Sequence, residues 1–555
     1  MGVTSGMGSS PFGAKETRVE DKLGGLAPTP LRIDRLVREL QAYPIIEDRD
    51  VLIEGLSKGF TVPVKGVVAG AMKARNLKSA AELPGVLKEK LGKEVECGRM
   101  AGPFAEKRIA ELIISPLGVV PKKEEGKYRM IHHLSYPKGR SVNDAIDKAE
   151  AAVQYQSFDS AVQLVRNAGR GAMMAKIDIE SAFRLLPLNP DSFKLMGCKF
   201  EGQFYVDKCL PMGCSISCSF FEKFSTFLHW LAVARQKRDS IVHYLDDFMV
   251  VGRAGTDRCE CMKKGLIGLF EEMGVPVADK KTEGPCARLA FLGITIDSLK
   301  GQCELPEDKV EKAREMIAWM ATRKKVTLRE MQKTLGVLNF ACKVIPIGRI
   351  FKRRLEISTR GAKKPEHMIR VTKEMRDDLK VWDQFLQEFN GVRIWQEVAP
   401  AVDFELYTDA AGGKGYGAYF QGRWCAGEWP ESWKEMGWIK NLVLLELFPI
   451  VVAMELWGGE LANRTIICWS DNMGVVEIIN QLSASSMPVV KYLRYLVLKC
   501  LKHNICVRAK HIPGFKNVVA DALSRFKWKE FRELAPNARQ EGECCPMLLW
   551  QIGSG

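Results

Sequence analysis

The segment SIVHYLDDFMVVG, residues 240–252, constrains the fold of this chain more than any other. Two adjacent acids, Asp246 and Asp247, stand between apolar runs that are rich in β-branched and aromatic residues. This pattern is typical of a β-hairpin that carries both acids at its turn. A solvated turn without further function is the alternative interpretation, because four-residue motifs such as YLDD recur by chance. The surrounding sequence has to decide between the two.

A third acid upstream favours a metal site. In AKIDIESAFRLLPL, residues 175–188, Asp178 ends an apolar strand pattern and Phe183 follows five residues later. Three carboxylates at the ends of adjacent strands would raise one another's pKa, and burial would add to that cost. Divalent ions remove the cost, because oxygen ligands suit Mg²⁺ and two ions stabilise both the attacking and the leaving oxygen of phosphoryl transfer. The sequence therefore predicts nucleotidyl transfer with Mg²⁺ as the cofactor, two ions in the site, and Mn²⁺ as the alternative ion.

Five motifs in this order resemble the reverse transcriptase family. Asp178 with Phe183 resembles its first palm motif, LPMGCSIS at 210–217 the second, YLDD at 244–247 the third, and ADKK at 278–281 with LAFLGITI at 289–296 the fourth and fifth. The predicted hairpin VVPKKEEGKYRMI, residues 119–131, resembles the fingers loop that holds the incoming triphosphate, with Lys122 and Arg129 at the matching positions. Lysine offers phosphate a point charge and arginine a planar fork. Exposed hairpin charges without a ligand are the alternative.

The resemblance implies a role for each matching residue. Phe183 would exclude the ribose 2′-hydroxyl, with a plain core residue as the alternative, and Gly213 would let the backbone approach template or nucleotide closely. Met212 stands where retroviral enzymes have Gln, so no side-chain hydrogen bond to the substrate is expected there. Lys281 would protonate the departing pyrophosphate; an ordinary solvated lysine fits equally well, because Lys280 is adjacent. The implied metal ligands are Asp178, Asp246 and Asp247.

A second set of acids follows downstream. The strand patterns FELYTD and TIICWSD end at Asp409 and Asp471, Glu446 lies among apolar residues in the helix pattern 442–457, and Asp521 opens the last helix pattern. A solvent-facing Glu446 and a helix-capping Asp471 are the alternatives. The set resembles the four-carboxylate site of ribonuclease H, which uses two Mg²⁺ ions to cleave the RNA strand of an RNA/DNA hybrid. Phe515 stands where retroviral ribonucleases H place a mobile His, which implies slower cleavage or cleavage without His-assisted product release.

Alternating strand and helix patterns predict an α/β multidomain protein. By the resemblance, it is a right-hand polymerase with fingers, palm and thumb, followed by a connection region and a ribonuclease H-like domain. A capping-box pattern at Thr327 and Glu330 introduces the helix predicted over 328–342. The predicted parts are a flexible arm (1–30), a helical N-terminal extension (31–108), fingers and palm (109–300), a helical thumb (301–345), a basic connection (346–400), the ribonuclease H-like domain (401–527) and a C-terminal tail (528–555).

The charge of the chain favours a polyanionic partner. With 82 Lys and Arg against 67 Asp and Glu, the formal net charge is +15, and residues 343–373 alone hold ten basic residues against two acidic ones. A solvated linker is the alternative to a surface that follows a duplex through sequence-independent phosphate contacts. The residues predicted to bind nucleic acid are Arg353, Arg354, Lys363 and Lys364. The expected partners are an RNA template, a DNA primer, an RNA/DNA hybrid and dNTPs.

Compartment and membrane contact can also be predicted. The sixteen cysteines are scattered without zinc-ligand spacing, and the sequence opens without a secretory leader pattern, so a reducing compartment is expected. The most apolar stretch, residues 442–457, is too short to span a bilayer and contains two Glu and a Pro. We therefore expect an intracellular protein, in the cytoplasm or the nucleus, with no membrane partner.

The upstream and thumb-like segments look most like DIRS-like retrotransposons, which are associated with a tyrosine recombinase, and NVVADALSR is also typical of gypsy-type elements. An element-encoded recombinase or capsid-like protein would then be a partner on another chain. The alternative function is a domesticated nucleic-acid-binding scaffold that keeps the fold without the chemistry. The presence of all seven carboxylates argues against it.

Overall fold

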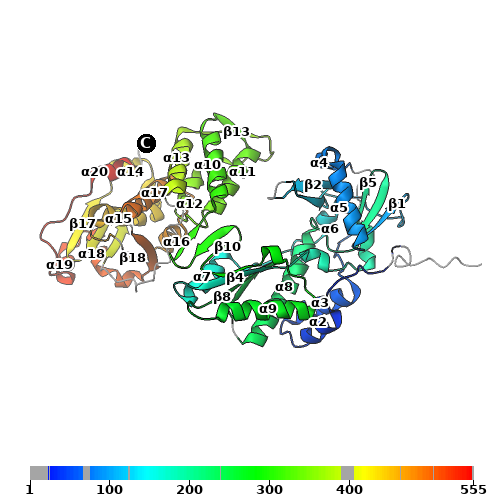
Figure 1. The fold of residues 1–555 in the computed structure, drawn as a ribbon. Helices are drawn as coiled ribbons and strands as arrows, with labels where there is room; N and C mark the ends of the chain where they lie inside the picture. Colours follow the sequence, from blue (N-terminus) through cyan, green and yellow to red (C-terminus); the bar gives the residue numbers. More distant parts are fainter. Residues whose placement is uncertain are drawn as a thin grey trace, which may run out of the picture. The chain divides into compact units, whose positions relative to one another are not determined.

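A computed structural model describes residues 23, 25–66, 75–122, 126–237, 239–388, 406–462, 464–503 and 505–552. The chain divides into two compact units, Met1–Leu292 and Gly293–Gly555 (Figure 1). The predicted arm lies largely outside the described residues. Its last part is packed, because Leu23 is buried in the core of unit 1 and the Thr29 hydroxyl donates to the Leu185 carbonyl at 2.8 Å. Packed structure therefore begins earlier than Leu31, where the sequence predicted it.

A four-stranded antiparallel sheet forms the centre of unit 1. Its order is β7 (Ile241–Tyr244), β8 (Asp247–Gly252), β4 (Met173–Asp178) and β9 (Glu283–Cys286). Helices α7 (Phe158–Ala168), α8 (Ser215–Gln236) and α9 (Arg258–Met273) pack on it. The apolar run after the paired acids is buried from Phe248 to Val251, which explains its lack of polar alternation. The hairpin predicted from SIVHYLDDFMVVG is confirmed as β7 and β8.

The remaining strands of unit 1 form smaller sheets. One has the order β1 (Met100–Phe104), β6 (Gln203–Asp207) and β5 (Gly197–Phe200), and β10 (Arg288–Phe291) lies beside β4. The predicted basic hairpin is confirmed as β2 (Leu117–Pro121) and β3 (Tyr128–His132), which place Val120 opposite Arg129. The extension contains α2 (Ile33–Leu40), α3 (Ile46–Lys58), α4 (Lys78–Glu82) and α5 (Pro84–Glu96), as its helical patterns predicted. A short helix, α6 (Val142–Ala145), follows the hairpin.

Unit 2 opens with the hairpin β11 (Ile294–Asp297) and β12 (Gln302–Glu304) and a helical part. Its helices are α10 (Glu307–Ala321), α11 (Leu328–Ala341), α12 (Gly348–Ser358) and α13 (Lys373–Glu388). The predicted capping box is confirmed, because Glu330 N donates to the Thr327 hydroxyl at 3.3 Å and Thr327 N to the Glu330 carboxylate at 2.7 Å. The ribbon β13 (Lys325–Thr327) with β14 (Met368–Arg370) sets Lys325 opposite Arg370.

A five-stranded mixed sheet organises the rest of unit 2. Its order is β17 (Arg423–Glu428), β16 (Gly415–Phe420), β15 (Leu406–Ala411), β18 (Thr465–Ser470) and β19 (Cys506–His511). The first three strands are antiparallel, whereas β15, β18 and β19 run parallel. The accompanying helices are α14 (Glu431–Glu435), α15 (Leu442–Trp457), α16 (Met473–Gln481), α17 (Met487–Lys502) and α18 (Val518–Ser524). Every strand predicted here is present, and the predicted α/β class is confirmed in both units.

Residues 528–552, which the sequence indicated as a tail, fold against this sheet domain. They contain α19 (Trp528–Leu534) and α20 (Met547–Gln551), so α18 is not the last helix. Tyr492 donates its hydroxyl to the Leu549 carbonyl at 2.8 Å, and Trp550 stacks on Phe448 with ring centroids 4.5 Å apart. Among the described residues of the whole chain, no helix combines the length and the hydropathy that crossing a bilayer requires.

Candidate metal centres

The first three acids meet at one end of the central sheet of unit 1. Asp178, the last residue of β4, lies directly opposite Asp247, the first residue of β8, and Asp246 occupies the turn before it. Leu245, which shares that turn, has a left-handed backbone with φ 53°, a conformation that costs a leucine on the order of 1 kcal/mol. The buried Glu222 carboxylate accepts the Leu245 N–H at 3.1 Å and so holds the strained turn in place.

The three carboxylates at this end of the sheet repel one another, and a bound cation would relieve that repulsion. Burial raises the pKa of Asp247 to about 6, and the neighbouring charges of Asp246 and Asp178 add to the shift. Burial also raises the pKa of Asp246, followed by the charge of Asp178. Lys281 supplies one positive charge, since its ammonium lies 2.8 and 3.1 Å from the two Asp178 oxygens. These carboxylate oxygens are the ligands that a hard divalent ion prefers, and the cluster fits such an ion.

A cavity of about 770 Å³ opens beside these acids. Its lining brings together Lys122, Arg129 and Met212, which lie far apart in the sequence, with Asp178, Asp246 and Lys281. Four further lining residues come from the extension, where no sequence motif marked them: Lys90, Lys93, Glu94 and Arg99. The cavity therefore has a carboxylate end and a strongly basic wall, as a triphosphate with its metal ions requires.

Phe183 and Gly213 make contacts within unit 1 that the sequence did not indicate. Phe183 is half-buried and packs edge-on against Phe221 at 5.3 Å, while its neighbours Ala182 and Arg184 line the cavity. Gly213 has φ 119°, and a Cβ there would lie 2.2 Å from the His132 carbonyl oxygen. The close approach that requires glycine is thus made to strand β3 of this chain. Packing within the protein therefore already requires glycine at this position, and the approach of Gly213 to template or nucleotide stays a prediction.

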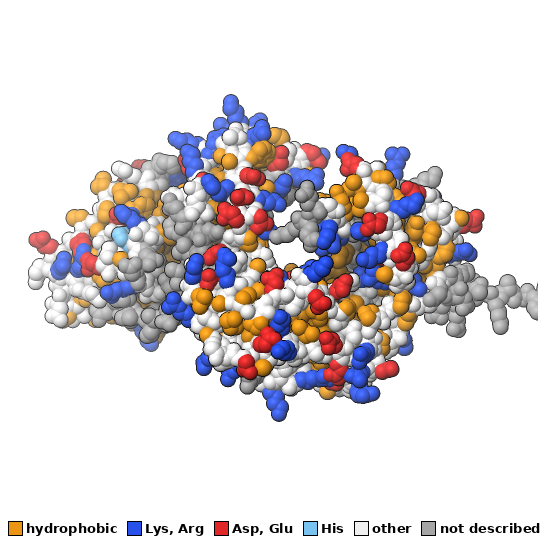
Figure 2. Space-filling view, viewed as in Figure 1, with side chains coloured by type: hydrophobic (Ala, Val, Ile, Leu, Met, Phe, Trp, Pro, Cys, Tyr) orange, Lys and Arg blue, Asp and Glu red, His pale blue; other side chains and the backbone are white. Residues whose placement is uncertain are grey.

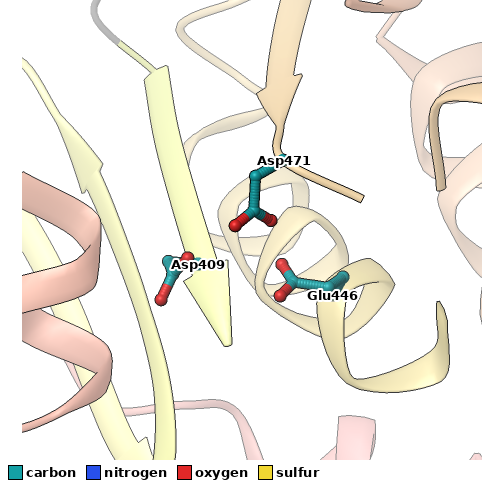
Figure 3. A group of neighbouring side chains, drawn as sticks. All are labelled: Asp409, Glu446 and Asp471. Atoms are coloured by element: carbon teal, nitrogen blue, oxygen red, sulfur yellow. The ribbon is translucent and has the colours of Figure 1, made fainter. Parts of the chain in front are cut away.

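The second centre joins three acids from separate elements of unit 2. Asp409 lies within β15, Glu446 in α15, and Asp471 directly after β18, with carboxylate oxygens within 4.8 Å of one another. Figure 3 shows the Asp471 and Glu446 carboxylates facing each other beside the strand that carries Asp409. Burial raises the pKa of Glu446 to about 9 and that of Asp409 to about 6, and the neighbouring acids add to both shifts. The donor set fits a hard divalent cation, which would remove this repulsion.

Asp521 and Phe515 lie at this centre in ways that the sequence did not indicate. Asp521 lies in the first turn of α18, which begins at Val518, and outside the three-acid group. Its carboxylate is paired with Arg525 at 2.6 Å and Lys527 at 3.3 Å, so two cations already balance its negative charge. Phe515 is 79% exposed, next to Gly514, which lies against the Asp471 carboxylate.

The two arginines of the predicted basic track have partners inside unit 2. Arg353 pairs with Glu356 at 3.0 Å. Arg354 lies 3.5 Å from the fully buried Asp378, which is also ion-paired with Arg494. Burial raises the pKa of Asp378 to about 7 in spite of the two guanidinium groups. These contacts correct the predicted track, because both arginine charges are used within the protein.

The chain is similar to known proteins in sequence and in structure. Residues 120–296, most of which belong to unit 1, match the family model Reverse transcriptase (RNA-dependent DNA polymerase). The chain is 23% identical over 434 residues to the putative enzymatic polyprotein of Cassava vein mosaic virus, covering 74% of this chain and 60% of that polyprotein. It is 24% identical over 304 residues to the Gag-Pol polyprotein of Walleye dermal sarcoma virus, covering 53% of this chain and 15% of that polyprotein. The chain thus spans less than two thirds of either relative.

Among solved structures, the chain is similar to the foamy viral protease-reverse transcriptase. With the complex of that protein and an RNA/DNA hybrid, the TM-score is 0.45 at 17% identity, over 86% of this chain and 63% of that one. With the complex with double-stranded DNA, the TM-score is 0.47 at 17% identity, over 88% of this chain and 98% of that one.

Proposed function

We propose that this protein is a retroelement reverse transcriptase, which polymerises DNA on RNA and DNA templates and cleaves the RNA strand of RNA/DNA hybrids. One observation carries the polymerase half: the reverse transcriptase domain holds three converging carboxylates beside a cavity with a basic wall. The test is extension of a DNA primer on an RNA template with dNTPs and Mg²⁺. Incorporation that depends on all three components is expected, and its absence under conditions where a control polymerase extends the same primer would overturn the proposal.

The candidate residues of unit 1 have different roles in the proposed nucleotide addition. Two Mg²⁺ ions held by Asp178, Asp246 and Asp247 would supply Lewis acidity at the attacking and leaving oxygens. Lys122 and Arg129 bind the phosphate oxygens of the incoming dNTP. Lys281 keeps a proton at the edge of the same cavity. Phe183 lies between Ala182 and Arg184, which line that cavity, and would exclude the ribose 2′-hydroxyl.

Lys281 gives a prediction in which two adjacent lysines serve as test and control. Its hydrogen bond to Asp178 raises the pKa of Lys281 against the effect of burial, so the ammonium stays protonated at neutral pH, as a general acid must. Lys281→Gln is expected to lower kcat by about 10²-fold, in the range for loss of general-acid catalysis. Lys280→Gln removes an equal charge and should cost less than about tenfold. Equal losses in single-turnover extension would show that Lys281 acts only through its charge.

The proposed cleavage of the RNA strand rests on the second group of acids, in unit 2. Asp409, Glu446 and Asp471 would bind Mg²⁺, whose chemistry is to activate water and stabilise the leaving oxygen. The Ser524 hydroxyl donates to Asp409 at 2.6 Å and fixes its orientation. The similarity to the Cassava vein mosaic virus polyprotein supports an element-like origin for part of unit 2 as well, because it covers more of the chain than unit 1 contains.

A basic surface at the β13–β14 ribbon of unit 2 suits the phosphates of the hybrid. Figure 2 shows Lys and Arg side chains gathered over β13 and the helices beside it. Lys325 and Arg370 stand directly opposite each other, an arrangement of like charges that destabilises a ribbon unless a ligand neutralises it. The exposed basic residues of this surface are Arg323, Lys324, Lys325, Arg329, Lys363, Lys364 and Arg370.

The salt dependence of hybrid binding tests this surface. The double variant Lys363→Gln, Lys364→Gln should lower the slope of log K against log salt by up to about 2, since each lysine contacts at most one phosphate. Arg353→Gln, Arg354→Gln is the matched control, because it also removes two charges, which are already paired within the protein. An unchanged slope in the lysine variant, measured by fluorescence anisotropy, would contradict the proposed contact.

The proposal also covers the cellular compartment of the protein and the kind of mobile element that encodes it. We propose an intracellular protein of a mobile element, with the DIRS-like branch supported by the upstream and thumb-like sequences and the gypsy-type branch next. A recombinase or capsid-like protein encoded by the same element would be a separate chain.

A further inference from the structure

A cluster of largely buried charged side chains begins at Arg184, next to Phe183 in the chain, and none of its members has a role in the proposed nucleotide addition. Arg184 is its centre. Its guanidinium lies 2.7 Å from the Asp207 carboxylate and donates to Glu94 at 2.8 and 3.0 Å. Glu94 also pairs with Arg99 at 2.9 Å, and the His132 ring lies 3.8 Å from Asp207.

These contacts tie together four separate parts of unit 1. Arg184 belongs to the 3-10 helix Ala182–Leu185, which carries Phe183. Glu94 lies in α5 of the extension and Asp207 ends β6. The guanidinium also approaches the carbonyl oxygens of Cys209 and Leu210 at 3.3 and 3.4 Å, just before Met212 at the cavity wall.

The cluster is charge-balanced and largely buried, with its side chains between 2% and 17% exposed. Two cations, Arg184 and Arg99, face two anions, Glu94 and Asp207. Burial opposes the ionisation of Asp207, but Arg184 and His132 together outweigh it and hold the pKa of Asp207 below its ordinary value. Arg184, Arg99 and Glu94 also line the 770 Å³ cavity, and the two arginines line a second cavity of about 520 Å³. The cluster is therefore part of the wall of the nucleotide cavity.

From this geometry we propose that Arg184 is a positioning residue for sugar selection: through Glu94 and Asp207 it fixes Phe183 and the segment leading to Met212, and thereby sets the preference for dNTPs over rNTPs. The proposal rests on the proposed function, because it concerns the same nucleotide cavity. It also assigns a role to the extension, since α5 supplies Glu94. A largely buried Arg fork accepts little change in the position of its partners, whereas the Phe183 side chain itself is held by apolar packing, including the edge-on contact with Phe221.

The test is single-nucleotide incorporation with dCTP and with CTP, each opposite the same template G, comparing the ratio of the two kcat/KM values. Arg184→Met keeps the length and loses the charge, and it should lower discrimination by about tenfold or more. Glu94→Gln keeps the Arg184–Asp207 pair and should lower it by about threefold. Arg235→Met is the control, because it breaks an ion pair with Glu272 at 2.6 Å outside the cavity, and its ratio should match the wild type.

A double-variant cycle separates positioning from general stability. In a Phe183→Ala background, Arg184→Met should cause no further loss of discrimination if Arg184 acts through Phe183. A merely structural role would lower kcat/KM for both nucleotides equally and leave the ratio unchanged in both single variants, which would overturn the proposal. If the Arg184→Met variant fails to fold, the ratio of the two kcat/KM values in the Glu94→Gln variant decides the question. Absence of incorporation of either nucleotide by the wild type would instead refute the proposed function.

Discussion

Primer extension by the Asp246→Asn variant is expected to fall at least about 10³-fold below the wild type, the loss that corresponds to removing ~4 kcal/mol of transition-state stabilisation by a metal ligand. Asparagine keeps the shape of the turn but removes the charge that balances a divalent ion. In the metal-free protein the same change removes a repulsive charge, because burial and Asp178 raise the pKa of Asp246. The variant should therefore be no less stable than the wild type, and its defect should be chemical.

Two further measurements serve as controls for this prediction. Thermal unfolding without metal should show no loss of stability in Asp246→Asn. Asp257→Asn, which changes an exposed acid of the same unit, should extend primers at the wild-type rate. Extension retained by Asp246→Asn would refute the assignment of this residue to the metal centre.

The Glu446→Gln variant is expected to lose hybrid cleavage by about 10³-fold while primer extension continues, because the two metal centres lie in different units. Glu455→Gln is a matched control on the same helix, since Glu455 is paired with Lys499 at 2.7 Å and belongs to no described acid cluster. Cleavage of a labelled RNA strand within a hybrid measures both. Unchanged cleavage in Glu446→Gln would remove the basis of the second centre.

The raised pKa of Glu446 also predicts how stability depends on pH. The folded group titrates near 9, because of burial and then Asp409 and Asp471, whereas an unfolded glutamic acid titrates near about 4.3. Between these values the folded state holds more protons than the unfolded state, so the stability of the metal-free protein falls as pH rises. Mg²⁺ binds the ionised form, and its stabilising effect should grow over the same range. In Glu446→Gln both trends should flatten, as followed by thermal unfolding.

The sequence was sufficient for features that depend on local pattern. Apolar runs ending in acids predicted the strands that carry Asp178, Asp247 and Asp409, because strand patterning and turn position are encoded within a dozen residues. The apolar surroundings of Glu446 indicated that it is buried. Matching motifs placed Lys122 and Arg129 on a hairpin that the structure confirms.

Features that depend on contacts between distant residues were missed. The buried cluster joins Glu94, Arg184 and Asp207 across more than a hundred residues, and no local pattern pairs them. Arg354 looked like part of a basic run until the fold supplied Asp378 from another helix. The close approach of Gly213 to the backbone of His132 could not be predicted from the sequence. In each case the partner residue lies on a different helix, strand or loop. The sequence therefore shows the charged residue or the glycine, but not the residue that it contacts.

The most direct test of the account is a single reaction that follows both strands of one substrate, a labelled DNA primer on a differently labelled RNA template with dNTPs and Mg²⁺. The wild type should lengthen the DNA and shorten the RNA. Asp246→Asn should cleave RNA without extending the primer, and Glu446→Gln should extend the primer without cleaving RNA. Loss of both activities in either variant, or of neither in both, would contradict the proposal that two independent metal centres carry a polymerase and a nuclease activity.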